Sequence, residues 1–353
     1  ETNLRISGEY FEESGTIPSN DGYERINGRF NIHHAVGEDF DISGSAFYSR
    51  SERDPIAGGD GQSGNALFGI QFMSPGVDIA RKTVGGQRNA EECSGGPADD
   101  CWFVVNPDPT VSSDRVNPLF QEQANLSTLE RGRVMGSAQA SWSPVTWFSL
   151  DGTFSYDRTD ENVEDFTRKG TPQGEGGGDA VGFMQRDDYL QEAINARLTA
   201  NFTGTFLDNE LTTRGMLRYL IEDQETNTFF ANGNDFVTQG IRTLDGLQDQ
   251  ETFSVGSNFQ SIKAQNLLAS LSLDYKDRYI VDALVRRDGS SLFGPEERWQ
   301  TYYRASGAYR LSEEPFFNVP AISNLKLRYS IGTAGSRPRF DMQYETFSIG
   351  GGG

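Results

Sequence analysis

The chain has 353 residues, of which 35% are hydrophobic and 12% aromatic, and its formal net charge is −20. The surplus of 51 acidic over 31 basic residues disfavours a nucleic-acid partner, because phosphate binding needs a basic surface. No uninterrupted apolar run of about 18 residues occurs, which excludes a transmembrane helix. Few hydrophobic but many aromatic residues are typical of a β-protein whose strands are apolar on one face, and not of a disordered chain.

The main pattern is a strict alternation of apolar and polar residues, which predicts β-strands. It begins near the start of the chain, where Ile26, Gly28, Phe30 and Ile32 alternate with polar neighbours, and it recurs in 148–158 and 299–311. Helical periodicity is absent from these segments, so the chain is predicted to be all-β. About twelve strands are expected, in chain order at 3–11, 23–35, 40–50, 131–142, 148–158, 190–204, 210–222, 264–274, 279–287, 299–311, 324–332 and 342–349.

The lengths of the segments and of their connections favour a membrane barrel. A tilted membrane-spanning strand needs about 9–11 residues, more than the usual strand of a soluble sheet. The connections alternate between short turns and long polar loops, as in outer-membrane barrels with short periplasmic turns and long extracellular loops. A soluble β-sandwich or propeller also has alternating strands, but it explains neither the strand lengths nor this asymmetry. The expected short turns are 35–39, 143–147, 205–209 and 275–278, and the expected loops are 51–130, 159–189, 223–263, 288–298 and 333–341, with 312–323 as a long exception on the turn side.

Charge and aromatic residues follow the same alternation. In a closed barrel one face meets lipid and the other meets water or a plug, so charge is tolerated on alternate residues only. The residues expected on the polar face are Arg29, Asp41, Arg133, Arg197, Arg214, Arg218, Asp282, Arg286, Arg304 and Arg328. Aromatic girdles at the two membrane interfaces are expected from Tyr10, Trp142, Trp147, Tyr156, Tyr275, Tyr279 and Trp299.

Residues for covalent or metal chemistry are scarce. Cys93 and Cys101 lie in a short segment rich in Gly and Pro and are a candidate disulfide, with free thiols as the alternative. The two histidines, His33 and His34, are adjacent and would point to opposite faces of a strand. No catalytic residues, metal ligands or cofactor are therefore predicted. A loose calcium site among the carboxylates of 157–165 is the one cofactor left open.

The last quarter of the chain carries a specific run of motifs. Strand 279–287 continues into Arg286-Arg287-Asp288-Gly289-Ser290-Ser291, then Phe293-Gly294 and Arg298-Trp299. Further on come Leu311 to Phe316, with the order LSEEPF, and Leu325 to Gly332, with the order LKLRYSIG. In this order the motifs resemble the SusC/RagA family of TonB-dependent outer-membrane transporters. The RRDGSS run itself is interpreted as a structural clasp, with Gly289 at positive φ and Asp288 capping a turn.

This resemblance implies a wide plugged barrel, of which the chain would be one part, with residues 1–353 all in the barrel domain. Both ends are interpreted as cuts inside a longer protein, whose plug domain and remaining strands would lie outside this chain. The implied function is TonB-dependent import of a bulky nutrient, an oligosaccharide or a peptide, with a passive porin or a structural or adhesive β-protein as the alternative. The implied partners are a SusD-like surface lipoprotein, the TonB complex and outer-membrane lipid, in the outer membrane of a Gram-negative, Bacteroidota-like bacterium.

Overall fold

The computed structural model describes residues 1–17, 20–55, 66–71, 78–80, 117–169, 181–248, 253–294, 296–339 and 342. Within these ranges the chain is dominated by strands in a single antiparallel sheet, which confirms the predicted fold class. The strands are β1 (Thr2–Glu13), β2 (Tyr23–Val36), β3 (Phe40–Arg53), β4 (Asn125–Val145), β5 (Phe148–Thr167), β6 (Phe183–Phe206), β7 (Leu211–Asn234), β8 (Ser254–Tyr275), β9 (Tyr279–Ser290), β10 (Trp299–Arg310) and β11 (Lys326–Gly332). The predicted strand 342–349 lies almost wholly outside the described residues.

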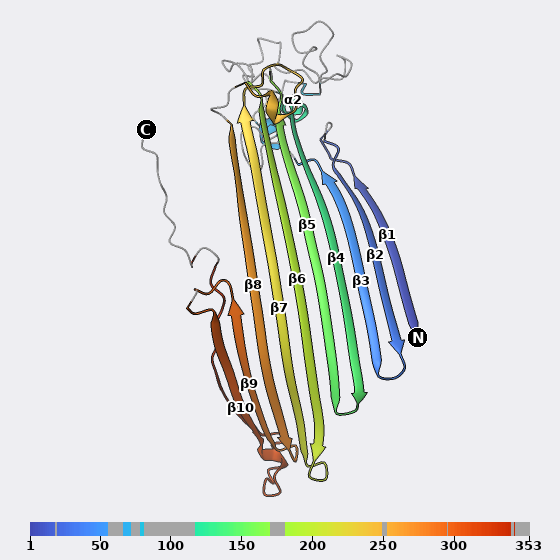
Figure 1. The fold of residues 1–353 in the computed structure, drawn as a ribbon, viewed down its shortest axis with the longest axis vertical. Helices are drawn as coiled ribbons and strands as arrows, with labels where there is room; N and C mark the ends of the chain where they lie inside the picture. Colours follow the sequence, from blue (N-terminus) through green and yellow to red (C-terminus); the bar gives the residue numbers. More distant parts are fainter. Residues whose placement is uncertain are drawn as a thin grey trace.

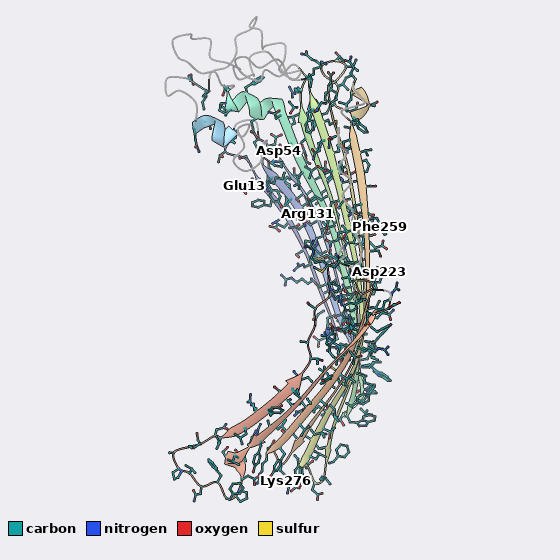
Figure 2. The ribbon with its side chains drawn as sticks, turned by 90° about the vertical axis from the view of Figure 1, so that its left-hand side faces the viewer. Glu13, Asp54, Arg131, Asp223, Phe259 and Lys276 are labelled. Carbon is teal, nitrogen blue, oxygen red and sulfur yellow. The ribbon has the colours of Figure 1, made fainter. Side chains whose placement is uncertain are left out.

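The sheet is an up-and-down meander in which each strand pairs with the next one along the chain, from β1 to β11. It bends into a deep trough with one convex and one concave side (Figures 1 and 2). Among the described strands, β1 and β11 each have a neighbour on one side only. A long meander with this curvature is the wall of a wide barrel, since such a sheet must close before it can cross a membrane.

The convex face carries an apolar band next to the short turns. On β5 and β6 the band begins at the directly paired Phe148 and Phe202 and rises to Tyr156 and Ile194. Its aliphatic members are exposed to solvent in the isolated wall, as Leu198 at 50% and Leu271 at 45% show. About eight residues separate the first and last members on each strand, or roughly 25 Å, which matches the apolar band of an outer-membrane barrel.

The concave face carries the predicted charged residues, many of them in cross-strand pairs. Arg133 donates to Asp157 on the neighbouring strand, with 2.6 Å between Nη2 and Oδ2. Arg25 pairs with Glu9, with 3.1 Å between Nη2 and Oε1. Figure 2 shows Arg131 on the concave side, and Asp223 and Phe259 on the convex side. The parity expected from the sequence therefore separates the two faces of the wall.

The predicted strand ends were wrong where the wall rises beyond the apolar band. Residues 159–167, 183–189, 223–234 and 254–263 were expected in loops, but they extend β5, β6, β7 and β8. In these extensions polar residues occupy both faces, because both faces meet water. The sequence alternation therefore disappears while the hydrogen-bonded ladder continues. For the same reason Tyr156 lies in the middle of its strand, at the upper edge of the band, and not at a strand end.

Short helices and small cores lie at the rim opposite the short turns. Helices α1 (Ala66–Gln71) and α2 (Pro118–Ala124) interrupt the long segment between β3 and β4, on the concave side of the wall (Figure 2). The larger of the small cores packs Phe166, Met184 and Phe236 together, and Phe236 is fully buried. Within the described residues, no helix is long and apolar enough to cross a membrane.

Candidate functional site

The register of β7 to β10 aligns two rows of side chains on the concave face. The first row runs Arg218, Leu268, Arg286 and Tyr302, each directly opposite the next across a strand pair. The second row, one step nearer the rim, runs Leu220, Asn266, Asp288 and Gln300. Residues from four strands therefore meet in one patch that the sequence spreads over more than eighty positions.

A cavity of about 340 Å³ opens over these rows. Its wall includes Phe293 and the segment Gly335–Arg337, which follows β11. Three guanidinium groups line it (Arg218, Arg286 and Arg337) against two carboxylates (Glu222 and Asp288), which leaves a net charge of one positive. The cavity is therefore polar, contains charges of both signs and opens toward the concave side of the wall.

The charged groups are held by contacts with one another. Arg286 pairs with Asp288, with 2.8 Å between Nη2 and Oδ2, and its guanidinium carbon lies 5.1 Å from the ring centre of Tyr302. Arg337 pairs with Glu222. Arg218 donates from Nε to the Thr199 hydroxyl at 3.2 Å. These contacts fix the positions of the donors and acceptors before any ligand arrives.

Two polar atoms of this cluster have no hydrogen-bond partner among the described residues: Arg286 Nε and Asp288 Oδ1. Asp288 is only 8% exposed. A buried polar atom without a partner costs about 1–3 kcal/mol, so groups that pair with both atoms would bind favourably. The cavity is therefore suited to bind a ligand with both donor and acceptor groups.

The sequence-predicted motif is divided between the two sides of the wall. Arg286 and Asp288 face the cavity, whereas Arg287 and Gly289 share the convex face with Trp299, which pairs directly with Gly289. The guanidinium carbon of Arg287 lies 5.1 Å from the ring centre of Trp299. This pair stands at the upper edge of the apolar band, where an interfacial tryptophan and arginine are expected.

The turn proposed for Asp288-Gly289 was wrong. Gly289 lies inside β9 and is not among the described residues with positive φ, and Asp288 pairs with Gln300 across the ladder. Glycine is needed there for another reason: a Cβ atom would lie 2.8 Å from the ring of Trp299. The indole thus lies flat across a strand position that has no side chain.

The serines of the motif close the outer end of the β9–β10 hairpin. The N–H of Ser290 donates to the carbonyl of Arg298 at 3.1 Å, and the N–H of Ser291 donates to the carbonyl of Lys263 at 2.8 Å. In return the Ser291 hydroxyl accepts from the N–H of Lys263 at 3.0 Å. Phe293 lines the cavity and Gly294 continues the same segment. These contacts agree with a clasp that holds β8, β9 and β10 together.

The other candidate groups are placed as follows. Cys93 and Cys101 lie outside the described residues. His33 and His34 point to opposite faces, His33 toward Asp41 and His34 toward Thr2.

The carboxylates of 157–165 belong to β5 and not to a loop, and they alternate between the two faces. Several of them are paired: Asp157 with Arg133, Asp160 with Arg158, Glu161 with Arg131, and Glu164 with Arg186 and Arg242. Within the described ranges, no group of three or more His, Cys, Asp or Glu residues is arranged to hold a metal ion.

Most of the cavity residues could not be chosen from the sequence. Arg218 was predicted on the polar face, but Glu222, Asn266 and Tyr302 were not singled out. Their position depends on strand register, because a slip of one residue would move all of these side chains to the opposite face of the sheet. The alternation in β7 to β10 predicts which residues share the concave face, but it does not predict which of them meet in one cavity.

Comparisons with known proteins agree with this architecture. No protein-family profile matches the chain. TonB-dependent receptor P26 of Formosa agariphila is 25% identical over 239 residues, which are 65% of this chain and 23% of that protein. TonB-dependent receptor P3 of the same organism is 22% identical over 339 residues, 94% of this chain and 31% of that protein. The chain thus spans less than a third of the length of these two relatives.

Solved structures show the same fold. The chain superposes on the RagAB peptide transporter with a TM-score of 0.67 and 15% identity, covering 94% of this chain and 35% of that chain. For the closed-closed state of the RagAB peptide importer the TM-score is 0.69, with 16% identity, 95% of this chain and 35% of that chain. The resemblance read from the motifs is confirmed: in sequence this chain is similar to TonB-dependent receptors, and in fold it matches the RagAB transporter.

Proposed function

We propose that the protein imports a bulky nutrient, a peptide or an oligosaccharide, across the outer membrane in a TonB-dependent manner, as the barrel component of a SusC/SusD-like complex. The chain contributes one wall of the barrel. Its convex face contacts outer-membrane lipid, and its concave face lines the path of the cargo or holds the plug. The plug and the remaining strands belong to the rest of the protein.

One observation carries this proposal: the wall separates an apolar convex band from a charged concave face that includes a preformed cavity. A barrel wall with a polar inner face fits a water-filled or plugged lumen. The cavity that Arg218 and Tyr302 line offers positively charged hydrogen-bond donors and negatively charged acceptors. Peptides and oligosaccharides both present alternating donors and acceptors, so either class can satisfy the two unpaired atoms of Arg286 and Asp288.

Two partners follow from the resemblance. A SusD-like lipoprotein would cover the extracellular rim, where β4 to β8 rise beyond the apolar band and α1 and α2 lie on the concave side. The TonB complex would act from the opposite side, through the plug. The wall itself provides neither a reaction centre nor a bound cofactor in this proposal, so transport consists of binding followed by gated passage.

Uptake with and without energy coupling tests the proposal against a passive porin. Cells that produce the full protein would be given fluorescent oligopeptides and oligosaccharides, before and after an uncoupler collapses the proton gradient. The purified protein would be reconstituted in liposomes and its passive leak of small sugars measured. Uptake that stops with the uncoupler, with no leak in liposomes, is expected. Uptake that continues, together with a leak, would favour the porin.

A further inference from the structure

A second array of side chains lies on the convex face, beyond the apolar band. Register places Asp160, Leu190, Asn227 and Phe259 in one row across β5 to β8. The next row, toward the rim, is Asn162, Asp188, Phe229 and Ser257. These eight side chains surround a hollow of about 450 Å³. Phe259 is labelled on the convex side in Figure 2.

The two phenylalanines of this array are exposed. Phe229 is 42% and Phe259 57% exposed, and they stand diagonally on adjacent strands. Around them the polar groups are planar amides and carboxylates that are already oriented. Asn162 donates from Nδ2 to Asp188 Oδ1 at 2.8 Å. Asp160 is held by Arg158, with 2.8 Å between Nη2 and Oδ1.

Membrane lipid does not account for this array, because charged residues separate it from the apolar band. On β7 and β8 the pair Asp223–Lys263 lies between them, with 3.1 Å between Nζ and Oδ2. Phe259 lies eight residues beyond Leu267, the last aliphatic residue of the band on β8, and Asp160 lies four residues beyond Tyr156 on β5. At about 3.3 Å per residue these separations are roughly 26 Å and 13 Å along the strands. The array therefore lies beyond the apolar band, on the side of the surface sugars.

A second copy of the chain or a stable protein partner is also disfavoured. The array spans four strands about 4.8 Å apart and two rows about 7 Å apart, or on the order of 100 Å². A stable interface needs about 800 Å² from each side. The dimensions match two or three sugar rings instead.

The chemistry of the array points to the same class of ligand. Exposed aromatic rings stack on the C–H faces of sugar rings, while planar amides and carboxylates bind hydroxyl groups. With Asp160 paired to Arg158, Asp188 leaves the array with one net negative charge, so it disfavours phosphorylated, sulfated or uronic-acid chains. We propose that this array is a binding site for a neutral sugar chain on the outer wall of the barrel, separate from the concave face. The sugar could be part of a neutral lipopolysaccharide chain or a free glycan, since the contacts would be the same.

Binding by the full-length protein in detergent tests the proposal. The probes are maltoheptaose and laminarihexaose as neutral free glycans, a lipid-free neutral O-polysaccharide as the membrane source, and an oligogalacturonate as the anionic control. Calorimetric titration would compare the wild type with Phe229→Ala and Phe259→Ala. The matched control is Phe230→Ala, since Phe230 neighbours Phe229 in β7 but points to the concave face and is similarly exposed at 40%.

The expected result is binding of at least one neutral probe, weakened roughly two- to tenfold by each convex substitution and unchanged by Phe230→Ala. If only the O-polysaccharide binds, the ligand is a lipopolysaccharide chain of the membrane. If a free oligosaccharide binds, the ligand is a soluble glycan. Phe259→Tyr, which keeps the ring, should retain binding and shows that any loss is not due to misfolding.

Four outcomes would overturn the proposal. They are no binding of any neutral probe, binding of oligogalacturonate as tight as that of the neutral glycans, equal loss in Phe230→Ala, or a change of oligomeric state in Phe259→Ala without a change in sugar binding. None of these depends on import, so this test can fail while the uptake test succeeds.

Discussion

At the scale of single residues, the contact between Gly289 and Trp299 decides how the two strands of the RRDGSS hairpin pack on their lipid-facing side. A Cβ at position 289 would lie 2.8 Å from the indole ring. Gly289→Ala should therefore displace Trp299 and weaken its contact with Arg287, at a cost of about 1 kcal/mol in unfolding free energy. Urea unfolding in lipid vesicles, followed by tryptophan emission, measures this cost.

A matched control for this substitution lies on the same face. Gly307 is in the neighbouring strand β10, and nothing lies within 4 Å of the Cβ that an alanine would add there. Gly307→Ala should therefore leave the unfolding midpoint unchanged or raise it slightly. Equal effects at Gly289 and Gly307 would contradict the assigned role of the ring contact.

The pair Arg286–Asp288 gives a second prediction at this scale. Arg286→Gln removes the partner of a carboxylate that is 8% exposed, and an uncompensated buried charge costs about 3 kcal/mol. Adding Asp288→Asn should restore most of that stability, because it removes the stranded charge. Thermal unfolding of both variants checks this.

Arg287→Gln is the control, since its side chain lies on the opposite face of the same strand. It should cost only its exposed contact with Trp299, about 0.5 kcal/mol, far less than Arg286→Gln. If the double variant is as unstable as Arg286→Gln alone, the loss comes from packing and not from the unpaired charge.

At the scale of elements, the short turns hold residues in an unfavourable conformation. Lys276 and Asp277, between β8 and β9, have φ of 55° and 56°. This left-handed region suits Asn and Gly much better than Lys, at a cost of about 1 kcal/mol or more for the residue that is held there. Replacing the two residues by Asn-Gly should raise the unfolding free energy by about 1 kcal/mol.

This gain should exceed the loss of the exposed ion pair between Lys276 and Glu210, whose Nζ and Oε1 are 3.2 Å apart. Lys276→Arg, which keeps both the charge and the strained backbone, should not change the unfolding free energy. A gain in Lys276→Arg, or none in the Asn-Gly variant, would show that backbone strain is not the cause.

The connection between β10 and β11 contains an acidic anchor. Glu314 accepts a hydrogen bond from the Tyr279 hydroxyl at 2.6 Å and another from Arg278 at 3.3 Å. The hydrogen bond from Tyr279, helped by the charge of Arg278, lowers the pKa of Glu314. A lowered pKa stabilises the fold above the ordinary value of about 4.3, and this stabilisation is lost as the pH falls through the folded-state pKa.

Glu314→Gln should therefore be less stable than the wild type at neutral pH, with a difference that shrinks below about pH 4.3. Unfolding midpoints measured between neutral and acidic pH follow this difference. A gap that stays constant at all pH values would mean that the Glu314 carboxylate is not the titrating group.

The elements also show what the sequence can and cannot predict. The alternation located strands such as β2 and β10 nearly to the residue, because one face of each is apolar. It missed the outer halves of β5 to β8, because hydration of both faces removes the alternation. It also could not assemble the cavity of Arg218, Arg286 and Tyr302, since the meeting of these residues depends on register.

At the scale of the whole molecule, the wall sorts its residues by environment. The convex side is apolar up to a charged belt and carries the exposed aromatic array beyond it, while the concave side carries the predicted charged residues among mostly polar neighbours. This sorting underlies the proposed import, since it assigns one face to lipid and the other to the lumen. It also separates the proposed outer sugar site from the transport path.

The most direct test of this arrangement is depth-dependent fluorescence quenching in lipid vesicles. Single cysteines would be introduced by Leu198→Cys, Arg197→Cys and Ser257→Cys, after Cys93 and Cys101 are replaced by serine, and labelled with a fluorophore. Nitroxide groups on the lipid tails should quench the label at 198 only, while a water-soluble quencher should reach those at 197 and 257. Tail quenching at 197 or 257, or none at 198, would contradict the membrane-spanning wall.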